Sequence, residues 1–375
     1  MTVRHGLGSY PVYVEPGALG RLGPLAGAHA GGRQLALVTD STVGPLLGTY
    51  RGGTGPWHAS GSGRAELPAF VVELVVPAGE ASKNRAQWSA LSDQLLDRGF
   101  GRDTALVALG GGVVGDLAGF VAATYLRGIP HLQVPTTLLA MLDASVGGKT
   151  GVDTPHGKNL IGAFHPPVAV VADPLVLRTL PEREYRAGLA EAVKHGLIAD
   201  ASYFTWLGAS AEAITRRDET TLATLVRRSV EIKAAVVGED ERENGRRAIL
   251  NAGHTVAHAV EHASGYALAH GEAVALGLVA ECRLAETMGI GRPGLAAEVG
   301  ELLGRLGLPV RLERPLPQDR VLAAMAADKK NRAARVRFAL ARDVGIMFPG
   351  EHWTVAAEEQ SIASALRGLA AGSSE

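Results

Sequence analysis

Three things are scarce in this sequence, and each scarcity excludes a class of protein. Cys282 is the single cysteine of 375 residues, so the chain forms no intramolecular disulfide and no cysteine cluster that could hold zinc. Neither sign of charge predominates, because 37 Lys and Arg face 38 Asp and Glu, which argues against a basic nucleic-acid-binding surface and against disorder. No uncharged apolar run reaches the roughly 18 residues of a membrane span, and residues 1–10 lack the apolar core of a signal peptide. We therefore expect a cytoplasmic protein without membrane or nucleic-acid partners, in which histidine and carboxylate groups would hold any metal.

Glycine is abundant where aromatic residues are few. The 48 glycines, against 5% aromatic residues, favour tight turns and close backbone approaches over an aromatic binding face. A chain of this length is expected to form two domains. In the first half, short apolar runs alternate with helical patterns; the runs are 35–39, 71–76, 105–109, 132–134 and 168–171. This alternation predicts an α/β domain whose largely parallel sheet is covered on both faces.

Helical periodicity dominates after Leu180. Apolar residues recur at intervals of three or four, which predicts helices over 182–198, 222–237, 249–263, 271–288 and 293–306. Two β-rich runs, 336–340 and 344–347, predict a late hairpin. We place the domain boundary between Asp173 and Pro181, which gives an N-terminal domain 1–177 and a C-terminal domain 178–375.

The glycine-rich segment Gly110–Asp116 follows a predicted strand and opens a predicted helix. Glycines at this junction let the backbone approach a pyrophosphate, whose charge the helix N-terminus stabilises. The spacing differs from the usual dinucleotide fingerprint, so a purely structural turn is the alternative. Asp40, at the end of the first predicted strand, suits either a ribose hydroxyl or the cap of the next helix.

Two lysines, Lys149 and Lys158, lie nine residues apart beside glycine and small polar residues. Mobile cations next to exposed backbone donors are what a phosphorylated or carboxylated ligand requires. Either lysine alone would be interpreted as a solvated loop residue. Because they follow the glycine-rich turn closely, we interpret the pair as ligand-binding.

The helical half offers a metal site. His254 and His258 lie at i and i+4 on one helical face, and His270 begins another predicted helix. Glu191 is a carboxylate inside an apolar helix, with Lys194 one turn on; a buried carboxylate needs a metal or a hydrogen-bonding partner. One carboxylate and two histidines would suit zinc with one coordination position open for a substrate hydroxyl. The alternative is a structural Glu191–Lys194 pair beside core histidines.

Taken together, these motifs resemble those of the 3-dehydroquinate synthase family. The likeness runs from about Leu35 to the late hairpin. It is carried by segments 110–116, 126–128, 135–139, 143–150, 157–164, 189–191, Lys194, 253–255 and 270–274.

The resemblance implies a Rossmann-like, largely parallel α/β domain that binds NAD, an all-α (mostly helical) metal-binding domain, and an active site in the cleft between them. The implied ligands of one divalent metal, zinc or cobalt, are Glu191, His254 and His270. The implied NAD-binding residues are Asp40, Gly79, Glu80, Ala81, Ser82, Lys83, Gly111, Gly112, Val113, Val114, Gly115, Asp116, Thr136, Thr137, Lys149, Lys158 and Thr179.

The resemblance also implies a substrate site in a homodimer. The substrate-binding residues would be Lys149, Lys158, Asn159, Lys194, Lys233, Arg247 and Asn251, with Lys329 or Lys330 at the phosphate and Arg127 supplied by the neighbouring subunit. The catalytic residues would be Asp143, Lys149, Asn159, Lys194, Glu243 and His258. The family commonly has Asn where Asp153 stands and Gly where Ala257 stands, and neither difference removes a metal-binding group.

The implied reaction is a phosphate-eliminating lyase step of the shikimate pathway of aromatic amino acid biosynthesis. It converts 3-deoxy-D-arabino-heptulosonate 7-phosphate into 3-dehydroquinate by NAD-dependent transient oxidation, β-elimination, reduction and aldol cyclisation. The alternatives are another sugar-phosphate cyclase of the 2-epi-5-epi-valiolone synthase type, a metal-dependent polyol dehydrogenase, and a non-catalytic nucleotide-binding scaffold. The segment 145–149, together with Arg247 and Asn251, favours the dehydroquinate synthase activity.

Overall fold

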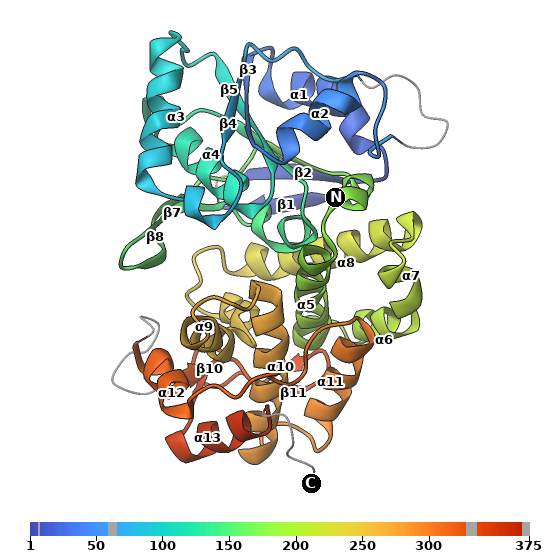
Figure 1. Ribbon diagram of the computed structural model, residues 1–375, viewed down its shortest axis with the longest axis vertical. Helices are drawn as coiled ribbons and strands as arrows, with labels where there is room; N and C mark the ends of the chain where they lie inside the picture. The colour runs from blue at the N-terminus through green and yellow to red at the C-terminus, as the bar shows by residue number, and fades with distance from the viewer. Residues whose placement is uncertain (7, 59–65, 328–335, 370–375) are drawn as a thin grey trace. The chain divides into compact units, whose positions relative to one another are not determined.

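The computed structural model describes residues 1–6, 8–58, 66–327 and 336–369, so the predicted phosphate contacts Lys329 and Lys330 lie outside the described residues. The chain divides into two compact units (Figure 1). The first comprises Met1–Pro181 and Glu219–Gly238, and the second comprises Glu182–Asp218 and Glu239–Glu375. The boundary expected at 177/178 lies close to Pro181. We expected Glu219–Gly238 to belong to the C-terminal domain, but this segment groups with the first unit. Helical periodicity predicts that one face of a helix is buried, but it does not identify the neighbour that buries it.

A seven-stranded sheet forms the centre of the first unit. In spatial order its strands are β1 (Thr2–His5), β2 (Gly8–Val14), β9 (Ala169–Ala172), β6 (His131–Pro135), β5 (Thr104–Gly110), β3 (Gln34–Asp40) and β4 (Val72–Val76). The β1–β2 pair is antiparallel, and all the other neighbouring pairs are parallel. The prediction of a largely parallel sheet is confirmed, and its five apolar runs correspond to β3, β4, β5, β6 and β9.

Helices cover both faces of this sheet (Figure 1). The unit contains α1 (Leu22–Ala30), α2 (Val43–Arg51), α3 (Arg85–Asp97), α4 (Gly112–Thr124) and α8 (Glu219–Glu239). Ala36 and Val38 of β3 join Leu117 of α4 in one buried layer. Leu37 and Val107, which point to the opposite face, are also fully buried. Burial on both faces explains why these strands read as continuous apolar runs in the sequence.

An antiparallel hairpin, β7 (Lys149–Thr154) and β8 (Gly157–Phe164), carries the two lysines of the predicted ligand site. Lys149 begins β7 and pairs in register with Phe164. Both lysines are exposed, as the alternative of solvated residues expected, but they lie on strands and not in loops. The strand pattern is hidden in the sequence because β8 is exposed along most of its length and shows no buried alternation.

The second unit is mostly helical, as predicted. Its helices are α5 (Glu182–Ala199), α6 (Ala201–Ala209), α7 (Ala211–Thr215), α9 (His254–Ala263), α10 (His270–Thr287), α11 (Leu295–Arg305), α12 (Gln318–Ala327) and α13 (Glu359–Arg367). Two small antiparallel sheets accompany them: β10 (Arg337–Phe338) with β13 (Val355–Ala356), and β11 (Ala341–Asp343) with β12 (Ile346–Met347). The domain is thus not all-α, and the predicted hairpin was wrong in its pairing. No helix among the described residues is long and apolar enough to cross a lipid bilayer.

The start of α9 differs from the predicted helix 249–263. Residues Arg246–Asn251 form a 3₁₀ helix, Gly253 follows with a φ of 80°, and α9 begins at His254. A left-handed φ is a conformation that glycine adopts at little cost, so Gly253 ends one helical segment and starts the next. The predicted metal ligand His254 consequently occupies the first turn of a helix.

Helix α10 is buried along most of its length and approaches two neighbouring backbones closely. A Cβ placed on Gly271 would lie 1.8 Å from the carbonyl oxygen of Ala187 in α5, and one placed on Gly277 would lie 1.9 Å from the carbonyl oxygen of Gly253. Real side chains cannot occupy these positions. The two glycines therefore allow α10 to pack against α5 and against the residue that precedes α9.

We expect Gly277→Ala to destabilise the protein although alanine is the better helix former. The added methyl group would push α10 away from Gly253, and overpacking of this kind costs about 1–3 kcal/mol. Gly304→Ala in α11 is the matched control, because a Cβ there meets nothing within 4 Å, and it is expected to be neutral or stabilising by up to ~1 kcal/mol. Thermal unfolding of metal-free proteins measures both effects, and equal midpoints for the two variants would contradict the close packing.

Candidate active site

Three predicted metal ligands come together in the second unit. Glu191 lies on α5, His254 begins α9 and His270 begins α10. Each offers one ligand atom, and the three atoms lie within 4.8 Å of one another. Nε2 of His254 is 3.5 Å from Oε1 of Glu191, and Nε2 of His270 is 3.9 Å from the same oxygen. Helix α5 and the two consecutive helices α9 and α10 thus direct one carboxylate oxygen and two ring nitrogens toward one another.

The two oxygens of Glu191 have different neighbours. Oε1 faces the histidines, whereas Oε2 forms an ion pair with Lys194. Glu191 is 1% exposed and Lys194 is 2% exposed. The Glu191–Lys194 pair that was the structural alternative is therefore present, and it leaves the other carboxylate oxygen directed at the histidines.

The pKa values of the two histidines are shifted in opposite directions. Burial, with a further contribution from the Lys194 charge, holds the pKa of His254 well below its usual range. His254 is therefore neutral at pH 7, which is the form that binds a metal. Burial also acts to lower the pKa of His270, but the hydrogen bond to Glu261 and the charge of Glu191 outweigh it and raise that pKa overall.

A buried carboxylate on α10 holds the N-terminus of α9. Glu281 is 3% exposed; its Oε2 accepts a hydrogen bond from the Gly253 amide at 2.7 Å, and its Oε1 accepts one from the Val256 amide at 3.2 Å. The sequence analysis did not single out Glu281 or Glu261. Glu281, like Glu191, is a carboxylate within an apolar helix, so the same sequence pattern could have indicated it.

Further predicted residues of the second unit lie near the start of α9. His258 is exposed, and its ring centroid lies 5.6 Å from that of His254. Asn251 Nδ2 donates to Glu243 Oε1 at 2.7 Å, so these two predicted residues contact each other. Arg247 is 2% exposed, and its Nη1 donates to the carbonyl of Glu241.

In the first unit, the predicted glycine-rich turn joins β5 to α4. A Cβ on Gly110 would lie 2.6 Å from Val114, and one on Gly115 would lie 2.6 Å from Oε1 of Gln133, so close packing accounts for both glycines. A Cβ on Gly112 would meet nothing closer than Ala144, at 3.4 Å. Packing does not explain the glycine at this first position of α4, which is where a bound phosphate needs open backbone.

Lys83 lies within a cluster of predicted residues in the first unit. Its Nζ is 2.6 Å from Oδ2 of Asp116 and donates to Oδ1 of Asn159 at 2.6 Å. Lys158, on the same hairpin as Asn159, is 3.7 Å from Glu80. Burial lowers the pKa of Lys83, but the nearby Asp116 raises it, and the net effect is a rise. Burial raises the pKa of Asp116, and Lys83 opposes this rise. Because Lys83 Nζ and Asp116 Oδ2 are only 2.6 Å apart, we assign both groups their charged forms.

The remaining predicted residues of the first unit are also engaged. Lys233 of α8, 5% exposed, donates to Oδ1 of Asp143 at 2.7 Å, and Asp143 lies in a π-helical turn (Ala140–Ala144). Asp40 Oδ1 accepts from the amides of Thr42 and Val43, which cap α2. The capping role considered for Asp40 is thus observed, and its role toward a ribose stays a prediction.

Three predicted threonines are held by local hydrogen bonds. The Thr136 amide donates to the Gly110 carbonyl, and Thr137 Oγ1 accepts from the Ala140 amide. Thr179 Oγ1 accepts from Trp57 Nε1 and donates to the Val176 carbonyl. The bonds of Thr137 and Thr179 orient their hydroxyls, whereas that of Thr136 involves only its backbone, and none of them by itself indicates a ligand.

Backbone strain coincides with three predicted substrate contacts. Arg127, Asn159 and Glu243 have φ values of 67°, 55° and 60°. Left-handed conformations are uncommon for non-glycine residues and concentrate at functional sites. This observation is independent of the resemblance that first indicated these residues.

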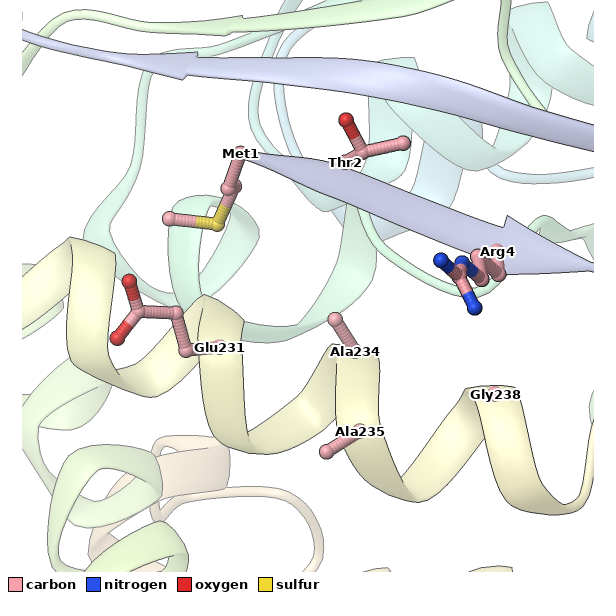
Figure 2. Close-up of a pocket in the computed structure, with 7 residues that line it drawn as sticks. All are labelled: Met1, Thr2, Arg4, Glu231, Ala234, Ala235 and Gly238. Carbon is pink, nitrogen blue, oxygen red and sulfur yellow. The ribbon is translucent and has the colours of Figure 1, made fainter.

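A hollow between β1 and α8 contains none of the predicted site residues (Figure 2). It is lined by Met1, Thr2, Arg4, Glu231, Ala234, Ala235 and Gly238. Its charged groups are the side chains of Arg4 and Glu231 and the N-terminal ammonium of Met1, and no group of the metal site or the glycine-rich turn lines it. We therefore assign it no part in the chemistry.

Comparisons with known proteins show the family of this chain. The family models described as 3-dehydroquinate synthase N-terminal and 3-dehydroquinate synthase C-terminal match residues 73–187 and 188–331. A 3-dehydroquinate synthase of Desulforamulus reducens is 45% identical over 348 residues, covering 92% of this chain and 94% of that protein.

Solved structures share the fold. The crystal structure of 2-deoxy-scyllo-inosose synthase complexed with carbaglucose-6-phosphate, NAD+ and Co2+ has 24% identity and a TM-score of 0.87, and the match covers 98% of this chain and 99% of that chain. A 2-epi-5-epi-valiolone synthase from Streptomyces hygroscopicus subsp. jinggangensis 5008, with NAD+ and Zn2+ bound, has 29% identity, a TM-score of 0.80 and 96% coverage of each chain. This chain belongs to the 3-dehydroquinate synthase family.

Proposed function

We propose that this chain is an enzyme that converts 3-deoxy-D-arabino-heptulosonate 7-phosphate into 3-dehydroquinate and phosphate, using NAD and one divalent metal. The observation that carries the proposal is the convergence of Glu191 Oε1, His254 Nε2 and His270 Nε2 within 4.8 Å. The family membership and the identity of 45% with a curated synthase support the same activity.

The three side chains fit a catalytic zinc or cobalt ion. Metal bonds of about 2.0–2.2 Å in tetrahedral geometry place ligand atoms roughly 3.3–3.6 Å apart. The observed separations of 3.5 and 3.9 Å from Glu191 Oε1 therefore require only small movements. One carboxylate and two neutral imidazoles leave a coordination position for substrate. Neutral His254 already has the protonation state that such a ligand needs.

The glycine-rich turn fits NAD. Gly112 opens α4 without a packing reason for its missing side chain, and backbone donors at a helix N-terminus suit a pyrophosphate. Glu80, Lys83, Asp116 and Lys158 form a charged cluster in the same unit. We therefore assign NAD binding to this turn and cluster, as the resemblance implies.

The chain's own residues supply binding and proton transfer. When bound, NAD would take a hydride from one substrate carbon and later return it, and the metal would polarise the hydroxyl on that carbon. His258, exposed one turn after His254, is placed to exchange a proton with substrate or solvent. Lys149 and Lys158 are exposed cations on the β7–β8 hairpin that suit the substrate's anionic groups. Asp143 positions the ammonium of buried Lys233.

The assembly and location are part of the proposal. The family resemblance supports a cytoplasmic homodimer in which Arg127 reaches the neighbouring subunit's site. The strained backbone at Arg127 agrees with a functional role for that side chain.

The first test of the proposed function is the balance between products. We expect one phosphate per heptulosonate consumed without net accumulation of NADH, because the hydride that NAD accepts is returned in each turnover. Phosphate release is measured by a colorimetric assay and NADH by absorbance in the same reaction. Steady accumulation of NADH without phosphate would instead support the polyol dehydrogenase alternative.

A further inference from the structure

Glu261 is a buried carboxylate that the proposed function does not use. It lies in the last turns of α9, and its side chain is only 7% exposed. Its Oε1 lies 3.5 Å from Nδ1 of His270, across the interface between α9 and α10. A buried carboxylate is costly unless it has a partner, and the imidazole of His270 is a partner of suitable chemistry.

The two nitrogens of His270 face different acceptors. Nδ1 faces Glu261, while Nε2 faces Oε1 of Glu191 at 3.9 Å. A neutral imidazole carries one hydrogen, so an acceptor at Nδ1 places that hydrogen there and leaves the lone pair on Nε2. Nε2 is the atom that points toward the other two ligands.

The second histidine shows the same arrangement with a different acceptor. Nδ1 of His254 faces the carbonyl oxygen of Ala252 at 3.2 Å, and its Nε2 faces Glu191 Oε1 at 3.5 Å. Both rings therefore have an oxygen acceptor at Nδ1 and the convergence point at Nε2. For His254 the acceptor belongs to the backbone and cannot be substituted, whereas for His270 it is a side chain and can be tested.

We propose that Glu261 is a positioning residue of the metal site, which holds His270 in the Nδ1–H tautomer and fixes the direction of its Nε2. The inference rests on the metal site of the proposed function. Hydrogen-bond acceptors behind ligating histidines are known to contribute about 10–100-fold to metal affinity.

The experiment compares Co²⁺ binding by metal-free wild-type protein, Glu261→Leu, Glu261→Gln and Glu301→Gln. Leucine keeps approximately the volume and removes the acceptor, whereas glutamine keeps a carbonyl oxygen that can accept from Nδ1–H. Glu301, exposed on α11, is the matched control for loss of one negative charge. Dissociation constants come from titration, and the visible absorption bands of bound Co²⁺ report ligand geometry independently of activity.

We expect Glu261→Leu to bind Co²⁺ about 10–100-fold more weakly with altered absorption bands, Glu261→Gln to recover much of both, and Glu301→Gln to match wild type. Wild-type affinity and an unchanged spectrum in Glu261→Leu would overturn the proposal. Equal loss in the leucine and glutamine variants would overturn it too, because the acceptor would then not be the property that matters. If the wild-type protein itself bound no Co²⁺, the metal site of the proposed function would fail, which is a different result from a failure confined to Glu261.

Discussion

His254→Ala is expected to lose the bound metal and at least ~10²-fold in turnover, the scale observed when a major electrostatic stabiliser is removed from an active site. Of the three proposed ligands the variant keeps Glu191 and His270, and two ligands hold zinc far more weakly than three. Glu191→Gln is expected to have a similar effect on rate. It also deprives the buried ammonium of Lys194 of its counter-charge, so it should lower stability as well.

His258→Ala is the control for this experiment. Its ring lies beside that of His254, but its nitrogens are not among the converging ligand atoms, so the variant should keep the metal and lose rate only. Elemental analysis after zinc supplementation and a phosphate-release assay separate the two effects. A His254→Ala protein with about one metal ion per chain and near-normal activity would disprove the ligand assignment.

Sedoheptulose 7-phosphate is expected to be at least ~10³-fold poorer in kcat/KM than the heptulosonate. Of the two sugars, only the heptulosonate carries a carboxylate. Arg247 is buried, and Asn251 holds its amide in a hydrogen bond to Glu243, so this region presents oriented donors rather than mobile ones. A site with a fixed cation and oriented polar groups matches an anionic substrate, and a substrate that lacks the anion forgoes those interactions and is therefore rejected strongly.

The role of Arg247 is tested by comparing both substrates in two variants. Arg247→Ala should impair the heptulosonate reaction and leave any sedoheptulose reaction nearly unchanged. Arg246→Ala is the control, because Arg246 lies next in sequence but is 39% exposed and pairs with Glu239. Phosphate release gives the rates, and mass spectrometry identifies the products. Faster turnover of sedoheptulose 7-phosphate by the wild-type protein would favour the cyclase alternative over the proposed function.

Much of the fold was predictable because some patterns depend on local geometry alone. Strands such as β3 and β5 are buried on both faces, so they appear as continuous apolar runs whatever their neighbours are. The i, i+4 spacing of His254 and His258 places them on one side of a helix in any context. The Glu191–Lys194 pair likewise follows from one turn of helix.

Other features were not predictable because they depend on which surfaces meet. The periodicity of α8 shows a buried stripe, but only the folded chain groups this helix with the first unit. Residues 337–338 pair with 355–356 instead of with the nearby strand, because short strands carry too little pattern to specify a partner. Lys158 lies on β8, a strand whose exposure hides its period.

The metal site shows the same division most clearly. The sequence by itself placed Glu191, His254, His258 and His270 on predicted helices as candidate ligands, because residue type and helical position are local properties. The resemblance to the family then implied Glu191, His254 and His270 as the ligand set. Only the tertiary structure decided that Glu191 turns one oxygen to the histidines and the other to Lys194, and that Glu261 stands behind His270. Those relations depend on the close approach of α10 to α5 and to Gly253, which Gly271 and Gly277 permit. The physical reason is that periodicity determines the direction in which a side chain leaves its own helix, whereas its partner is determined by packing between helices far apart in sequence.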